Sequence, residues 1–213
     1  MTSMTRLKRL KSLPALLGST LALAAASVAL PALALDIVYS APLSGAAEFP
    51  PNASAGTGLA TVTFNDDDFT MRVQVSFAGL TGTTTASHIH CCTAAAGAGN
   101  AGVATTTPTF PNFPLGVSSG MYDQTFDLTQ AGSWNAAFIT ANGGTIASAF
   151  AALSTGLAGG NAYLNVHSTF APGGEIRGFL QASAVPEPAS YALMLAGVVL
   201  AVGGLARRRA RQG

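Results

Sequence analysis

Three histidines are the side chains of this sequence best suited to chemistry, and they are the only histidines among its 213 residues. His88 and His90 flank Ile89 in a short run typical of a β-strand. Alternate side chains of a strand point to the same face, so this pair presents two imidazoles on one surface. His167 lies in a later strand-like run, and pairing of the two strands would add a third imidazole. Three converging imidazoles would suit a mononuclear copper or zinc ion.

Two roles for these histidines remain open from the sequence. They could form hydrogen bonds with the backbone and with each other, which would tie the long segment 91–120 to the sheet. Alternatively, His88, His90 and His167 could be metal ligands. A catalytic cysteine–histidine pair is disfavoured, because the adjacent residues His90 and Cys91 face opposite ways on a strand.

Cys91 and Cys92 are the only cysteines of the chain. A long-range disulfide within the chain is therefore impossible. We expect a vicinal disulfide between the two, which would stiffen the turn after the histidine strand. A bridge to another molecule and metal-bound thiolates are the alternatives.

Glu175 and Arg177 are opposite charges two residues apart in another strand-like run. Residues at this spacing share a face of a strand. The sequence thus predicts a surface or half-buried ion pair between them.

The central part of the chain predicts the elements that must position these side chains. Short runs with period-two alternation indicate β-strands, and Asn65 to Asp68 form a polar turn between two of them. Short antiparallel strands of this kind favour a sandwich or barrel. From Ser133 to Leu157 the apolar spacing is helical, and Asn142-Gly143-Gly144 divides the segment into two short helices. The predicted strands are 36–40, 59–64, 71–77, 86–90, 122–128, 162–167 and 175–181.

The first 34 residues have the pattern of a secretory signal peptide. A basic start precedes an apolar run from Leu13 to Leu30, and Ala32-Leu33-Ala34 offers a site for signal peptidase. We predict cleavage after Ala34. Export would place both cysteines in an oxidising compartment.

The C-terminal end predicts a membrane-spanning segment. Prolines at 186 and 188 end the central domain. Residues 189–206 carry no charge and, as a helix, would span about 27 Å, enough to cross a membrane. The arginines that follow belong on the cytoplasmic side by the positive-inside rule.

Charge separates the middle of the chain from its ends. Residues 35–184 hold two arginines against eight acidic side chains, a net charge of −6. Nucleic-acid binding needs a basic surface, so this class of function is excluded.

The tail resembles the PEP-CTERM sorting signal. The resemblance covers residues 185–213, with the motif Pro186-Glu187-Pro188, the apolar helix and the terminal cluster Arg207, Arg208 and Arg209. It implies recognition and processing by an exosortase-type membrane protease in a Gram-negative bacterium that makes exopolysaccharide.

The segment 35–184 resembles the CHRD domain. The matching motifs occur in the family's order: Leu43-Ser44-Gly45-Ala46 with Glu48 and Pro50-Pro51, Gly79-Leu80-Thr81-Gly82, His88-Ile89-His90, Asn161 to His167, and Gly173 to Gly178. The resemblance implies an all-β, antiparallel immunoglobulin-like sandwich, here with one or two short helices packed on it. Copper/zinc superoxide dismutases also combine His-x-His with a late histidine, but no bridging fourth histidine exists here, so dismutase activity is not supported.

Two functional hypotheses follow. The first is a non-enzymatic surface or matrix protein, exported and anchored in the inner membrane until its tail is processed, that binds exopolysaccharide or other surface proteins. The second is a redox-type metalloenzyme with copper or zinc at His88, His90 and His167.

Overall fold

The alternating apolar residues of the middle segment form eight β-strands in the computed structural model, which describes residues 36–183 and residue 197. The strands are β1 (Ile37–Ser44), β2 (Thr57–Asn65), β3 (Thr70–Ala78), β4 (Thr84–His90), β5 (Gly120–Asp127), β6 (Tyr163–Ser168), β7 (Ile176–Phe179) and β8 (Gln181–Ala182). Within residues 36–183, four short helices complete the fold: the 3-10 helices η1 (Gly45–Ala47) and η2 (Ala131–Ser133), and the α-helices α1 (Ala136–Ala141) and α2 (Ile146–Ala158).

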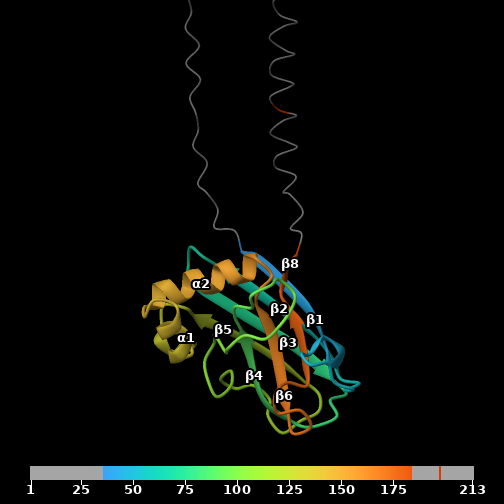
Figure 1. The fold of residues 1–213 in the computed structure, drawn as a ribbon. Helices are drawn as coiled ribbons and strands as arrows, with labels where there is room; N and C mark the ends of the chain where they lie inside the picture. The colour runs from blue at the N-terminus through green and yellow to red at the C-terminus, as the bar shows by residue number, and fades with distance from the viewer. Residues whose placement is uncertain (1–35, 184–196, 198–213) are drawn as a thin grey trace, which may run out of the picture. The chain divides into compact units, whose positions relative to one another are not determined.

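All strands belong to one antiparallel sheet in the order β4-β6-β7-β1-β2-β3-β5, with β8 paired to β1. The sheet curls, so that β4 and β6 lie across β2 and β3 (Figure 1). Ile89, Val166 and Ile176 from one half share a hydrophobic core with residues of the other half, such as Val62 and Val73. The predicted all-β antiparallel fold with short helices is confirmed, and its two layers are the halves of one continuous sheet.

The predicted hairpin around Asn65 to Asp68 is present as β2 and β3. Their register runs from Thr57 opposite Ala78 to Asn65 opposite Thr70. Apolar side chains alternate with polar ones along both strands, so one face of the hairpin is buried and the other is solvated.

The two predicted helices are also confirmed. Asn142 ends α1, and the hydroxyl of Thr145 accepts a hydrogen bond from the Ser148 backbone to cap α2. The apolar side of α2 buries Leu153 and Leu157, and Phe150 stacks on Phe64 of β2 at 5.1 Å between ring centroids. This contact holds α2 against the curled sheet.

The long segment between β4 and β5 has a defined path, although it forms no regular strand or helix. Val103 forms an isolated bridge with His90, and Thr105 forms one with Trp134. Phe110 and Phe113 are buried in the core. These contacts bring the backbone carbonyls of this segment next to the histidine strand.

Candidate metal centre

Strand pairing brings the three histidines onto one face of the sheet. In the antiparallel register of β4 with β6, His88 lies opposite Asn165, and His167 lies opposite Ala86. Because side chains alternate along a strand, His88 and His90 share the face of His167, while Ile89 enters the core on the other side.

Each imidazole is held by one backbone carbonyl. His88 donates from Nε2 to the Pro108 carbonyl at 2.6 Å, and His90 donates from Nδ1 to the Ala101 carbonyl at 2.9 Å. His167 donates from Nδ1 to the carbonyl of Pro172 at 2.9 Å. A carbonyl can only accept, so these bonds fix the tautomer of each neutral ring.

The other nitrogen of each ring carries a lone pair, and these three nitrogens lie close together. These are Nδ1 of His88 and Nε2 of both His90 and His167, and ligand atoms of the three residues lie within 4.8 Å of one another. His88 Nδ1 and His167 Nε2 are 3.3 Å apart. Neither carries a hydrogen in the tautomers just assigned, so no hydrogen bond can join them, and a cation between them would relieve the repulsion.

Burial keeps these rings neutral. His88 and His90 are 6% and 8% exposed, and His167 is half-buried. Desolvation lowers the pKa of His90 to about 4 and also lowers the pKa values of His88 and His167. His90 Nε2 is buried without a hydrogen-bond partner among the described residues. A buried neutral imidazole with a free lone pair is the form that binds metal.

The geometry fits a copper or zinc ion. Metal–nitrogen bonds of about 2.0–2.1 Å at tetrahedral angles place two ligand nitrogens about 3.3 Å apart. The separation of His88 Nδ1 from His167 Nε2 equals this value. The carbonyl bonds to the opposite ring nitrogens are the supporting contacts that metal-binding histidines commonly have.

Tyr163 and Arg177 form a second layer beside His90. The rings of His90 and Tyr163 are parallel to within 5°, with centroids 4.8 Å apart, and the Arg177 guanidinium carbon lies 4.6 Å from the Tyr163 centroid. The Tyr163 hydroxyl accepts a hydrogen bond from the Ala101 backbone at 3.2 Å, and Arg177 donates to Asn100 Oδ1 at 2.7 Å. Together these contacts fix the carbonyl that orients His90.

Cys91 and Cys92 form a vicinal disulfide. Their sulfur atoms pack against α2, where a Cβ at Gly156 would collide with both. The sulfur atoms are therefore directed to the helix, and the metal-ligand cluster within residues 36–183 contains no cysteine.

The predicted ion pair between Glu175 and Arg177 is wrong. Glu175 precedes β7 rather than lying within it, so strand alternation does not place the two side chains on one face. Arg177 instead lies beside Glu48, with Arg177 Nε 3.8 Å from Glu48 Oε2, and both side chains are buried. Arg177 Nε also donates to the carbonyl of Ala47 at 2.6 Å.

Glu48 and Asn165 are buried beside each other. Asn165 Oδ1 has no hydrogen-bond partner in the described part of the chain, and both Asn165 Oδ1 and Glu48 Oε1 border Gly174, whose φ of +140° suits glycine. Burial raises the pKa of Glu48 to about 7, against the opposing effects of Arg177 and of a hydrogen bond from the Asn165 side chain.

Glu175 forms a separate buried cluster. Its carboxylate accepts hydrogen bonds from the backbone of Thr81 at 2.5 Å and of Gly82 at 3.2 Å, and from the hydroxyls of Ser54 and Ser168. Burial alone would raise the pKa of Glu175, but these hydrogen bonds together hold it below its ordinary value. The cluster fastens the segment 79–82 to the start of β7.

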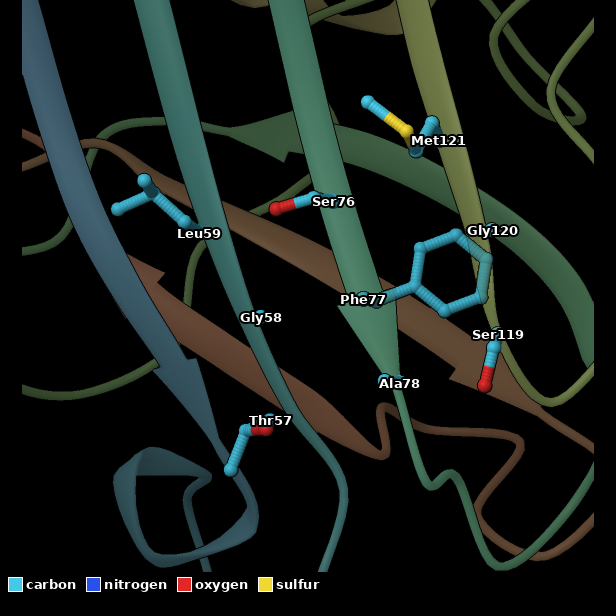
Figure 2. Close-up of a pocket in the computed structure, with 9 residues that line it drawn as sticks. All are labelled: Thr57, Gly58, Leu59, Ser76, Phe77, Ala78, Ser119, Gly120 and Met121. Atoms are coloured by element: carbon cyan, nitrogen blue, oxygen red, sulfur yellow. The ribbon is translucent and has the colours of Figure 1, made fainter.

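One surface depression lies away from this chemistry. It occupies the outer face of β2, β3 and the start of β5, and residues such as Leu59, Ser76 and Met121 line it (Figure 2). None of its lining residues is titratable, so it offers neither acid–base groups nor metal ligands.

Family models match two parts of the chain. The model of the CHRD domain matches residues 39–180, which is more than half of the chain. The chain belongs to the CHRD family. The histidines, the disulfide and the Glu175 cluster all lie within the CHRD domain. Searches of curated proteins and of solved structures gave no match.

A PEP-CTERM protein-sorting motif follows the CHRD domain at residues 184–210. This motif implies export and processing by an exosortase-type protease. The predicted cleavage site at Ala34 and the sorting residues Pro186 to Pro188 and Arg207 to Arg209 lie outside the described residues. So does the predicted membrane helix, apart from residue 197. Within residues 36–183 and 197, no helix has the length and hydrophobicity needed to cross a membrane.

Proposed function

We propose that this CHRD-domain protein is displayed outside the cell as a metal-binding module, with one copper or zinc ion held by His88, His90 and His167. The observation that supports it best is the 3.3 Å approach of two lone-pair nitrogens, His88 Nδ1 and His167 Nε2. In this proposal the protein binds the metal ion but catalyses no reaction. The competing hypothesis is a redox metalloenzyme built on the same ligands.

Metal analysis of the mature protein tests this proposal. After chelation and reloading, we expect one equivalent of copper or zinc per chain. A His88→Ala/His90→Ala double variant should retain none, because a single imidazole remains. Thr85→Ala, an exposed position of the same strand, is the matched control and should retain the full equivalent. A wild-type protein that holds no ion, both as isolated and after loading, would refute the proposal.

The sorting motif supports the cellular part of the proposal. A signal peptidase would cleave after Ala34, and residues 189–206 would anchor the domain in the inner membrane until an exosortase-type protease processes the tail. We propose that the released domain resides at the cell surface or in the extracellular matrix, among exopolysaccharide and surface proteins.

Changes in the tail are expected to block this processing. A Pro186→Ala/Pro188→Ala variant, or deletion of residues 207–211, should accumulate as the larger, membrane-associated form on immunoblots of cell fractions. Both changes lie outside the CHRD domain, so metal binding should be unaffected. Normal processing of both variants would argue against an exosortase-type route.

A further inference from the structure

We propose that the ion at His88, His90 and His167 keeps one coordination position open, and that a small exogenous ligand such as water, hydroxide or a simple anion occupies it. This inference rests on the proposed metal-binding function. It would give the site a property that a purely structural ion lacks.

The number of available donors supports an open position. In the described chain, the histidine cluster has three members and includes no Asp, Glu or Cys. The disulfide sulfurs pack against α2, and Glu48 directs its Oε2 toward Arg177. Copper and zinc sites commonly have four ligands, and a zinc site with three protein ligands takes its fourth from solvent.

The ligands are also fixed in place. Every imidazole is bound through its other nitrogen to a backbone carbonyl, of Pro108, Ala101 or Pro172. The His90 ring is further confined by its parallel stacking on Tyr163. Rings held in this way are fixed in orientation, so the three imidazoles bind the ion from fixed directions and leave the remaining position to another ligand.

The cluster is most accessible beside His167. His167 is half-buried, whereas His88 and His90 are almost completely covered. A ligand that enters beside this half-buried ring is therefore expected to be small.

A buried acceptor favours a ligand that carries hydrogen. Asn165 lies opposite His88 in the strand register, and directly opposite residues have Cβ atoms about 5 Å apart. Asn165 Oδ1 lacks a partner among the described residues. A metal-bound water or hydroxide could donate to such an oxygen, which would satisfy a group that is otherwise costly to bury.

Titration of the copper(II)-loaded mature protein with azide tests the inference. Azide is a small anion that gives a charge-transfer absorption when it binds copper(II). We expect a saturable, one-site absorption change with a matching change in the electron paramagnetic resonance spectrum. Thr85→Ala should give the same response as the wild type. His167→Ala, which removes a ligand, should lose the saturable change.

The outcomes separate this inference from the proposed function. A wild-type protein that binds no copper would refute both. Stoichiometric copper with no spectral response to excess azide would overturn only the open position. An intense sulfur-to-copper absorption before azide is added would also overturn it, because a thiolate would then occupy the fourth position.

Discussion

Replacing Glu175 by alanine is expected to lower the free energy of unfolding of the mature protein by about 3–5 kcal/mol. The Glu175 side chain is fully buried and accepts hydrogen bonds from two backbone groups and two hydroxyls. Alanine would leave the buried N–H of Gly82 and the buried hydroxyl of Ser168 without an acceptor. Each buried polar group without a partner costs about 1–3 kcal/mol.

Chemical denaturation followed by circular dichroism measures this loss. Asp123→Ala is the matched control, because Asp123 is an exposed carboxylate paired with Arg72 at 2.5 Å. Exposed ion pairs contribute little to stability, so Asp123→Ala should lower the free energy of unfolding far less than Glu175→Ala does. Glu175→Gln keeps an acceptor oxygen and should fall between the two. Equal losses for Glu175→Ala and Asp123→Ala would contradict the buried role of Glu175.

Acidifying the metal-free protein from about pH 6.5 to about pH 4 is expected to destabilise it. Burial lowers the pKa values of all three histidines, and that of His90 falls from 6.5 to about 4. Between these pH values the three histidines bind more protons in the unfolded chain than in the native chain. Stability from these groups is therefore present at neutral pH and lost as pH falls. His90 alone accounts for about 3 kcal/mol.

The pKa shift of Glu48 has the opposite effect on the pH dependence of stability. Its pKa rises from 4.5 to about 7, so the native chain holds a proton that the unfolded chain releases, and stability falls as pH increases through this window. The pKa shifts of His90 and Glu48 are similar in size and opposite in effect, so the lowered pKa values of His88 and His167 leave the net effect of acid destabilising. The melting temperature measured against pH checks both statements. Glu48→Gln should steepen the acid loss, and a melting temperature that is constant from pH 6.5 to 4 would contradict the prediction.

The histidine face was predictable because it depends on strand periodicity alone. The spacing of His88 and His90 fixes a common face in any strand. His167 needed one further assumption, that its strand pairs with theirs, and the register of β4 with β6 meets it. The carbonyls that orient the rings could not be foreseen, because Pro108 and Ala101 lie in a segment without periodicity.

Predictions from strand periodicity were wrong where the chain leaves regular structure. Glu175 lies before β7, where alternation does not apply, and so the expected pair with Arg177 does not form. Glu48 follows η1, where no sequence pattern indicates that a carboxylate will be buried beside Arg177. Asn165 shares a strand face with His167, a relation that the sequence does show, but its unpaired oxygen depends on tertiary packing.

The vicinal disulfide limits how this protein can associate with its surroundings. The sulfur atoms of the chain's two cysteines are bonded to each other. No thiol remains to link one copy covalently to the next or to a neighbouring surface protein. Intermolecular disulfides are thus ruled out while this bond is intact, so any association of the domain with a partner must use contacts other than cysteine.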